Sequence, residues 1–262
     1  MGKIVIIIAV VCLLAVSYFA ITLTQDKLSQ PERTILMVGT NTPFPPFEFR
    51  NGEDVVGFDI DLAKKIAQQL GRRLVIKDFT EFDALLPALQ AGDLDIVASS
   101  LTIRSDRDEV VDFSEPYYSA SQAILAKRGS KVSYQGRSED FQGLKVAYQK
   151  GTTSQFWVED NLLNKVNVAG YDVFDDLSYG LQLLTFGSVD ALILDQPVAE
   201  SFTKSNPELV IAGVIETGEQ YGLAVQQGDP RKLLPDANLV IAQMKNGKGY
   251  EQLLEKWFGG GK

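Results

Sequence analysis

Short apolar runs alternate with amphipathic segments between Thr34 and Ser100, and this alternation restricts the fold more than any other feature of the chain. The runs "TILMVGT", "RLVIKDF" and "DIVASS" have the length and composition of buried strands. Between them, "VGFDIDLAKKIAQQLG" and "FDALLPALQAG" carry apolar residues at helical spacing. In the first of these, Asp59 stands where a helix N-cap is expected and Gly71 where the helix should end. Alternating strands and helices predict parallel strand pairing with helices on both faces of a sheet.

The same plan returns later in the chain, where "LTFGSVDALILD" parallels "LQAGDLDIVASS". In each segment a helix ends in glycine, an aspartate follows (Asp95 or Asp190), and an apolar strand ends in a polar residue (Ser100 or Asp195). Units of this kind are common in α/β proteins, so the repeat is either coincidental or the mark of two related lobes. Open α/β sheets bind ligands at the carboxyl ends of their strands. Two such lobes would therefore present polar residues to a shared cleft.

The residue types that are missing exclude several kinds of chemistry. The 262 residues include no histidine and one cysteine, Cys12. Ser-His-Asp and Cys-His catalysis, His/Cys zinc sites and disulfides within the chain are thereby excluded. With 34 acidic against 25 basic residues and a net charge of −9, the chain lacks the basic surface that nucleic-acid binding requires. We expect a binding function without metal or cofactor; an enzyme would be restricted to Asp, Glu, Lys or Tyr.

Residues 1–25 are predicted to be a signal peptide or a membrane anchor. A single lysine is followed by an uncharged, apolar run up to Asp26. Ala15 and Ser17 suit cleavage by signal peptidase after Ser17, but the run is also long enough to span a bilayer uncut. Lipidation at Cys12 is a third alternative. In each case the rest of the chain is expected to be periplasmic or otherwise extracytoplasmic.

Four stretches together resemble a known family, namely "GTNTPFPPFEF", "VGFDIDLAKKIA", "FDALLPALQAGDLDIVASSLTIRSDRDEVVDFSEPYY" and "YQKGTTSQ". They are similar to the polar amino-acid-binding proteins of bacterial ABC importers, the type 3 solute-binding family. The resemblance implies an α/β, two-lobed periplasmic-binding-protein fold, in which each lobe is a mainly parallel sheet flanked by helices and two hinge strands join the lobes. It places the first lobe at 33–126 and 220–262 and the second at 127–219. It also implies a monomer that delivers an amino acid to an ABC permease in the inner membrane.

A buried amino acid needs partners for its carboxylate and its ammonium, because burying either charge unpaired is costly. Arg107 is placed to hold a carboxylate through two parallel hydrogen bonds, or else pairs only with acidic neighbours on the surface. Asp195 is either a helix N-cap or an acceptor for the ammonium. The resemblance implies the ligand-binding role for both, and leaves Arg104 in solvent. It adds the hydroxyl and backbone groups of Ser99, Ser100, Thr102 and Thr153.

The side chain of the ligand is expected to contact Asn41, Phe44, Phe82 and Gln149, with Glu48 and Glu81 nearby. Two phenylalanines suit a flat guanidinium, although they could equally be part of the core. Members of the family that bind cationic amino acids often have a carboxylate at the position of Asn41, and an amide there is also compatible with glutamine. Arginine is the favoured ligand, with glutamine or another polar amino acid as the alternative.

An enzyme on the same fold is a further alternative, since a few relatives are dehydratases that act on prephenate or arogenate. Such an enzyme needs an acid at the cleft, for which Glu81, Glu159 and Glu219 are candidates. The sequence singles out none of them. A tethered sensory module is a third class, but no kinase or second membrane segment follows in the chain. A binding protein without catalytic residues is therefore the prediction.

Overall fold

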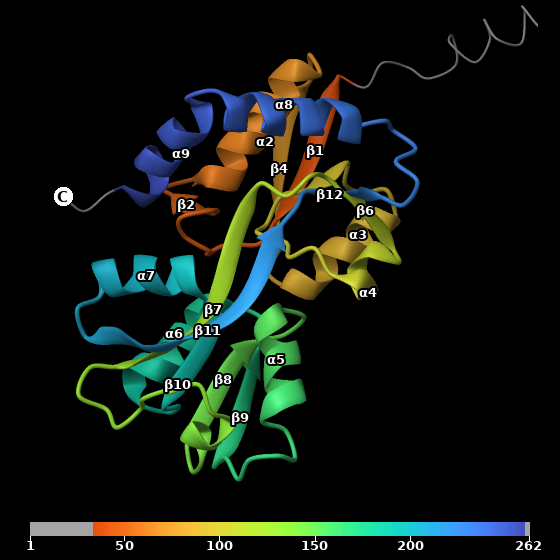
Figure 1. Ribbon diagram of the computed structural model, residues 1–262. Coiled ribbons are helices and arrows are strands. Elements are labelled where there is room, and N and C mark those ends of the chain that lie inside the picture. Colours follow the sequence, from red (N-terminus) through yellow and green to blue (C-terminus); the bar gives the residue numbers. More distant parts are fainter. Residues whose placement is uncertain (1–33, 260–262) are drawn as a thin grey trace, which may run out of the picture. The chain divides into compact units, whose positions relative to one another are not determined.

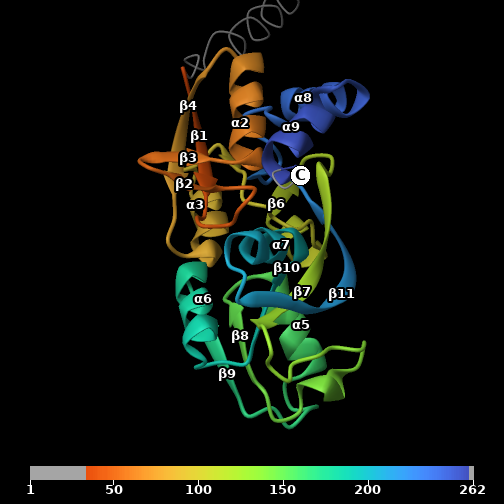
Figure 2. The same ribbon diagram turned by 90° about the vertical axis from the view of Figure 1, so that its left-hand side faces the viewer.

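Two five-stranded sheets form the framework of residues 34–259, the part of the chain that the computed structural model describes (Figures 1 and 2). The first sheet has the strand order β4-β1-β5-β12-β6. Its strands are β1 (Ile35–Thr40), β4 (Arg73–Asp78), β5 (Ile96–Val97), β6 (Val111–Phe113) and β12 (Ala224–Gln226). β1 pairs in parallel with β4 and β5, as the alternation of strands and helices predicts. β12 runs antiparallel to β5 and β6.

The second sheet has the order β11-β7-β10-β8-β9. Its strands are β7 (Tyr118–Lys127), β8 (Lys145–Gln149), β9 (Gly170–Phe174), β10 (Ala191–Asp195) and β11 (Leu209–Tyr221). β8 pairs in parallel with β9 and β10, whereas β7 is antiparallel to β10 and β11. Both sheets are thus mixed, parallel on one side and antiparallel on the other. A separate hairpin joins β2 (Phe49–Asn51) to β3 (Asp54–Val56).

Helices cover both faces of the sheets, and a sheet with its helices is called a lobe below. The first lobe has α2 (Phe58–Gln69), α3 (Leu85–Gln90), α4 (Ser105–Asp108), α8 (Leu234–Asn246), α9 (Gly249–Phe258) and the 3₁₀ turn η1 (Phe82–Ala84). The second has α5 (Thr153–Asn161), α6 (Leu177–Phe186), α7 (Gln196–Ser205) and η2 (Ser138–Phe141). Along β1, Leu36 and Val38 join the core under α2 and α8, and Met37 packs on the α3 side. Successive side chains of a strand point to opposite faces, so both faces of this strand are buried.

The repeated glycine–aspartate–strand plan forms matching structures in the two lobes. Both glycines adopt positive φ angles just after α3 and α6. Asp95 accepts a hydrogen bond of 2.7 Å from the backbone N–H of Met37 in β1, and Asp190 accepts one of 2.8 Å from the N–H of Lys145 in β8. Each aspartate thus ties its own strand to the start of a parallel neighbour. The interpretation of the repeat as two related lobes is confirmed.

The chain passes from the first sheet to the second between β6 and β7 and returns between β11 and β12. β7 and β11 are long strands that lie side by side (Figure 1). Their pairing register shifts between Ile215 and Glu219, where Gly218 has a φ of 63°. Glu219 is buried after this irregularity, although the residues at 216–218 are exposed.

The predicted two-lobed α/β fold is confirmed by this arrangement. The sheets are mixed and not mainly parallel as expected, because β12 in the first sheet and β7 in the second run antiparallel to their neighbours. The lobe limits at 33–126, 127–219 and 220–262 stay a prediction. The signal peptide or anchor predicted at 1–25, with Cys12, lies outside the described residues. Within residues 34–259, no helix is long and apolar enough to cross a membrane. The same residues contain no cluster of three or more His, Cys, Asp or Glu side chains suited to a metal ion.

Candidate functional site

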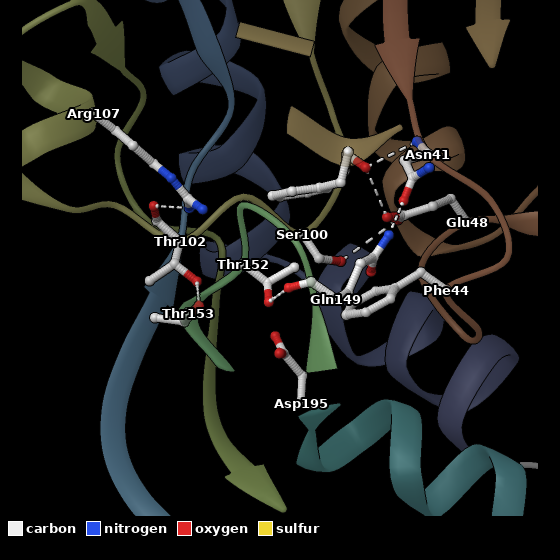
Figure 3. A pocket seen from close by; sticks show the side chains of 12 residues that line it. Asn41, Phe44, Glu48, Ser100, Thr102, Arg107, Gln149, Thr152, Thr153 and Asp195 are labelled. Carbon is white, nitrogen blue, oxygen red and sulfur yellow. Dashed lines mark hydrogen bonds between the residues drawn. The ribbon is translucent and has the colours of Figure 1, made fainter. Parts of the chain in front are cut away.

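A small cavity lies where strands of both lobes end (Figure 3). It is lined by Asn41, Phe44, Glu48, Phe82, Ser99, Ser100, Thr102, Arg107, Gln149, Thr152, Thr153 and Asp195. Asn41 directly follows β1, while Gln149 and Asp195 are the last residues of β8 and β10. This is the edge at which α/β sheets bind ligands. All the ligand-binding residues predicted from the sequence lie on this one cavity, to which the structure adds Glu48 and Thr152.

Arg107 is buried at the cavity wall, and its guanidinium bonds to both lobes. Its Nη1 donates to the carbonyl of Thr102 at 2.8 Å, and its Nη2 donates to the carbonyl of Gly151 at 2.9 Å. Burial, followed by the charge of Arg104, lowers the pKa of Arg107 to about 10, so the side chain stays cationic at neutral pH. The surface pairing considered for Arg107 is instead made by Arg104, whose Nε lies 2.9 Å from Oδ1 of Asp106.

Arg104 is not the solvated side chain that the sequence predicts. Its guanidinium lies 3.7 Å from the ring centre of Phe156, a residue of α5 in the second lobe. Lys150 and Asp83 form a second contact between the lobes, an ion pair of 2.9 Å. The sequence shows neither contact, because each joins residues that are adjacent only once the lobes meet. Together they hold the lobes against each other beside Arg107.

Asp195 ends β10 and carries a buried carboxylate at the cavity. Gln122 Nε2 donates to its Oδ1 at 2.6 Å, and the hydroxyl of Tyr221 donates to its Oδ2. Asp195 occupies the N-cap position of α7 but makes no side-chain capping hydrogen bond, which rules against the helix-cap alternative. Burial, and after it the charge of Glu219, raises the pKa of Asp195 to about 7. A cationic group in the cavity would relieve this accumulation of negative charge.

Ser100 stands in a backbone conformation that serine seldom adopts, with a φ of 48°. Its N–H donates to Oδ2 of Asp59 at 2.7 Å, and the hydroxyl of Tyr117 donates to the same oxygen at 2.6 Å. Asp59 is therefore not the predicted helix cap, and Gly57 occupies that position. The buried carboxylate instead fixes the turn that presents Ser100 to the cavity. Burial raises the pKa of Asp59 to about 7.

Glu48 is a buried acid on the cavity wall, although the sequence predicts only that it lies nearby. The hydroxyl of Ser99 donates to its Oε1 at 3.0 Å, and that of Ser100 reaches its Oε2 at 3.5 Å. Burial, with the charge of Asp59 next, raises the pKa of Glu48 well above its usual value. One feature of the sequence could have identified Glu48 as a lining residue. It lies in the "PPFEF" segment that follows β1, and a loop at the carboxyl end of a strand lies at the ligand-binding edge.

Two amides close the cavity near Glu48. Gln149 Nε2 donates to Asn41 Oδ1 at 3.0 Å and to the carbonyl of Asp175 at 2.7 Å. Asn41 Nδ2 donates to the carbonyls of Phe79 and Thr80. The amides therefore bridge the lobes. Figure 3 shows Asn41, Glu48 and Phe44 on one side of the view and Arg107 on the other.

The two aromatic residues contact the core as well as the cavity. Phe44 packs against the core cluster of α2 and α8, and Phe82 packs against that of α3. Each also lines the cavity, and the Arg107 guanidinium lies 5.6 Å from the ring centre of Phe82. Phe44 and Phe82 therefore pack in the core, as one alternative predicts, and can contact a ligand as well.

The threonines of the "GTT" turn lie at the start of α5. Thr152 is the N-cap residue, and its hydroxyl donates to the carbonyl of Gln149 at 2.7 Å. The hydroxyl of Thr153 donates to Glu219 at 2.8 Å. Backbone N–H groups at a helix start favour anions. The turn therefore offers a carboxylate a second partner beside Arg107.

Comparisons with known proteins agree with this geometry. Residues 36–260 match the family described as bacterial extracellular solute-binding proteins, family 3. The L-cystine-binding protein TcyJ of Escherichia coli (strain K12) is 32% identical over 233 residues, which cover 87% of this chain and 84% of that protein.

Two solved structures share both the fold and the sequence pattern. An ancestral arginine-binding protein bound to arginine is 41% identical, with a TM-score of 0.80 over 87% of this chain and 100% of that chain. An ancestral arginine-binding protein bound to glutamine is 40% identical, with a TM-score of 0.79 over 87% of this chain and 99% of that chain. The matched span, the two lobes and the cavity at their strand ends lead to one assignment: the chain belongs to family 3 of the bacterial extracellular solute-binding proteins.

Proposed function

We propose that this protein captures a polar L-amino acid, with arginine favoured, between its two lobes and delivers it to an ABC permease. The observation that supports this most directly is the pair of opposite buried charges, Arg107 and Asp195, on one small cavity. An α-amino acid presents a carboxylate and an ammonium a short distance apart, which two such charges match. Ser99, Ser100, Thr102 and Thr153 line the same cavity and add hydroxyl and backbone groups to it.

The preference for arginine follows from the balance of charge around the cavity. Glu48 and Asp195 line it as buried carboxylates, against Arg107 as the cation, and burial raises the pKa of both acids. A ligand with a net positive charge would stabilise the ionised carboxylates. Phe44 and Phe82 offer flat surfaces on which a guanidinium can stack.

Glutamine is the second candidate, because of the amides of Asn41 and Gln149. An amide side chain of the ligand could exchange hydrogen bonds with both. The relative bound to glutamine is described as an ancestral arginine-binding protein, so one scaffold of this kind holds either ligand.

The proposal assigns binding and not catalysis to the cavity. Glu81, Glu159 and Glu219 are the acids that a dehydratase could use, and none of them is among the lining residues. Glu81 is exposed, and Glu159 accepts a hydrogen bond of 2.7 Å from Gln155.

We further propose that the chain is exported through its N-terminal segment and acts as a monomer outside the cytoplasmic membrane.

A thermal-shift screen against the common L-amino acids tests the proposal. A ligand at 100 times its dissociation constant adds about 2.7 kcal/mol to the free energy of unfolding, which is readily measured. Arginine should give the largest shift, and isothermal titration should then show one site per chain. The absence of a shift with every amino acid would overturn the function. The largest shift with glutamine would overturn the preference for arginine alone, and consumption of prephenate on incubation would support the dehydratase alternative.

A further inference from the structure

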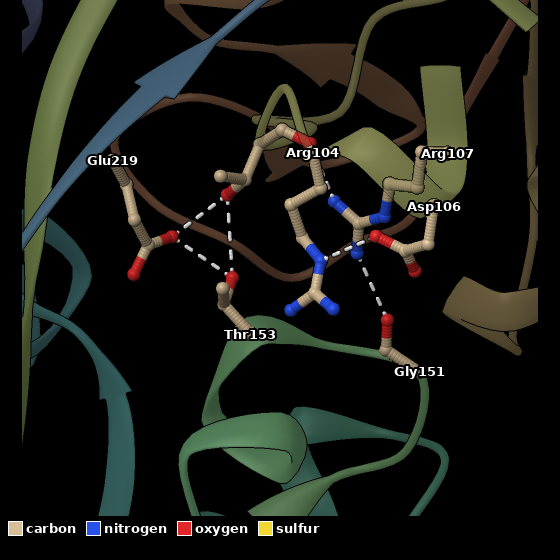
Figure 4. Close-up of polar contacts among 7 residues, drawn as sticks. Arg104, Asp106, Arg107, Gly151, Thr153 and Glu219 are labelled. Atoms are coloured by element: carbon tan, nitrogen blue, oxygen red, sulfur yellow. Dashed lines mark hydrogen bonds and ion pairs between the residues drawn. The ribbon is translucent and has the colours of Figure 1, made fainter. Parts of the chain in front are cut away.

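Glu219 bonds to threonines of both lobes through one oxygen, and Figure 4 shows its contact with Thr153. Its Oε2 accepts hydrogen bonds from the hydroxyl of Thr102 in the first lobe, at 2.7 Å, and from that of Thr153 in the second, at 2.8 Å. Its Oε1 accepts from Gln122 Nε2 at 2.9 Å and from the hydroxyl of Thr217 at 2.8 Å. Thr102 and Thr153 line the cavity, but Glu219 does not. Glu219 is therefore out of direct contact with a ligand, and acts on one through its neighbours and through its charge.

Thr102 and Thr153 can donate hydrogen bonds to a ligand only if their hydroxyl hydrogens point into the cavity. A hydroxyl has one hydrogen, and a carboxylate can only accept. Either threonine could donate to the other across the 3.2 Å between their oxygens, but the carboxylate oxygen is closer to both and is the stronger acceptor. Both hydroxyls therefore donate to Oε2, and neither hydrogen is directed into the cavity. Each oxygen is left with lone pairs. The wall formed by Thr102 and Thr153 is therefore an acceptor surface.

Gln122 links Glu219 to Asp195, a second group that can only accept hydrogen bonds when ionised. Its Nε2 donates to Glu219 and also, at 2.6 Å, to Asp195 Oδ1, while its Oε1 accepts from the hydroxyl of Ser154 at 2.8 Å. The amide orientation is thus fixed by three partners. The threonine wall and Asp195 all accept hydrogen bonds, whereas Arg107 supplies only donors.

We propose that Glu219 is a positioning residue that makes the Thr102–Thr153 wall an acceptor surface, so that the cavity selects ligands with an α-ammonium group. This inference rests on the proposed function and names the part of the ligand that Glu219 recognises indirectly. The irregular pairing of β11 before Glu219 is what brings its carboxylate inside, between the two lobes.

The variant Glu219→Gln keeps the size of the side chain but removes the exclusive acceptor. A glutamine amide donates through its nitrogen, which must face one of two sides. At the position of Oε2, Thr102 or Thr153 has to accept from it and turn its own hydrogen elsewhere; at the position of Oε1, it meets the donor Gln122 Nε2, which then has to move. Affinities for L-arginine and for 5-guanidinopentanoic acid, which is arginine without the α-ammonium, are measured by isothermal titration. Glu219→Gln should lower the affinity for arginine at least tenfold and change that for the analogue less than threefold. Equal losses for both ligands, or no loss for arginine, would overturn the inference.

Glu216→Gln is the matched control. Glu216 lies on the same strand, is exposed, and accepts a hydrogen bond of 2.9 Å from the hydroxyl of Ser121 away from the cavity. This variant should keep both affinities. A loss of arginine affinity equal to that of Glu219→Gln would mean that any such change on β11 disturbs the site, and the inference would fail.

A thermodynamic cycle with Thr102→Val gives a second readout. If Glu219 acts through the threonine hydroxyls, Glu219→Gln should cost much less arginine affinity in the Thr102→Val protein than in the wild type. Additive losses would mean that Glu219 acts by another route. Thr102→Val alone should also lose affinity for arginine and not for the analogue, which tests the inference should Glu219→Gln fail to fold.

Failure of this inference is distinguishable from failure of the proposed function. A wild-type protein that binds no amino acid contradicts the function. A wild-type protein that binds arginine, with both ligands affected alike by Glu219→Gln, contradicts only the role of Glu219. If the wild type prefers glutamine, the corresponding pair of probes is L-glutamine and glutaramic acid.

Discussion

The two ends of the cavity hold their polar groups in different ways. At one end, Arg107 and Asp195 are opposite charges, buried and held in place by backbone carbonyls, Gln122 and Tyr221. At the other end, Asn41 and Gln149 are neutral amides that bond to each other. Under the proposed function, the charged end serves the groups that all α-amino acids share. The amide end has to exchange its internal bonds for those of one particular side chain, so it decides which amino acid binds.

Removing Arg107 should have the largest effect, because it destroys the charged end. Arg107→Ala takes away the partner of the carboxylate and should lower the affinity for every amino acid by on the order of a thousandfold. Isothermal titration with arginine and glutamine measures this. Arg137→Ala is the control, since that side chain is 70% exposed and forms its ion pair with Asp140, three residues further along the chain. Normal binding by Arg107→Ala would show that the charged end is wrongly assigned.

Lowering the pH should weaken the same end by protonating Asp195, whose pKa burial raises to about 7 in the ligand-free protein. The ammonium of a ligand needs the ionised carboxylate, so affinity should fall about tenfold per pH unit below 7. Between pH 7 and pH 5 the loss is on the order of a hundredfold. Titrations at several pH values would reveal it, and an affinity that stays constant from pH 8 to pH 5 would contradict it.

The stability of the ligand-free protein should change in the opposite direction. Asp59 and Asp195 have a pKa of about 7 when folded, above the value of about 3.9 for an unfolded aspartate. The folded state therefore binds more protons between these values, and its free energy of unfolding falls as the pH rises through 7. The unfolding temperature without ligand should be lower at pH 8 than at pH 5, by on the order of 5 °C. Calorimetry decides this, and a higher unfolding temperature at pH 8 would contradict it.

A change at Glu48 should affect the affinity for arginine more than the affinity for glutamine, because Glu48 lies near the amide end of the cavity. Glu48→Gln removes the buried acid on the side of Asn41 that a cationic ligand would hold in its ionised form. It should lower the affinity for arginine by about 30-fold, while glutamine affinity changes only a few-fold. Glu53→Gln, at an exposed position of the neighbouring hairpin, is the control. If both ligands lost affinity equally, Glu48 would serve the whole cavity and not its specific end.

Asn41→Ala should have the smallest of these effects. It removes one amide of the pair with Gln149 and should change the ratio of arginine to glutamine affinity by about fivefold, with binding itself retained. Competition between the two amino acids measures the ratio directly. A loss of all binding would place Asn41 at the charged end.

Much of the fold and of the cavity lining is predictable from the sequence. Alternating strands and helices, together with the repeat that ends in Ser100 and Asp195, predict two lobes with polar strand ends, and such ends are where α/β sheets bind ligands. The resemblance to the solute-binding family adds Arg107, Gln149 and Thr153, which the structure brings to the same cavity.

What the sequence did not reveal depends on contacts between distant segments. Asp59 has the local pattern of a helix cap, but Ser100 and Tyr117 make it a buried acceptor. Arg104 lies in a charged stretch typical of a solvated turn, yet stacks on Phe156 of the other lobe. Glu219 becomes buried through a shift in strand pairing, and neither composition nor periodicity reports such a shift.

The contact of Arg104 with Phe156 also bears on how fast a ligand can leave. The two side chains belong to different lobes, so the stack must break each time the lobes separate. A guanidinium over an aromatic ring contributes about 1–2 kcal/mol when partly desolvated, equivalent to roughly a tenfold change in a rate. Under the proposed function, the residence time of a bound amino acid should depend on how often the Arg104–Phe156 contact breaks. Arg104→Ala should shorten that residence time, although Arg104 is not among the residues that line the cavity.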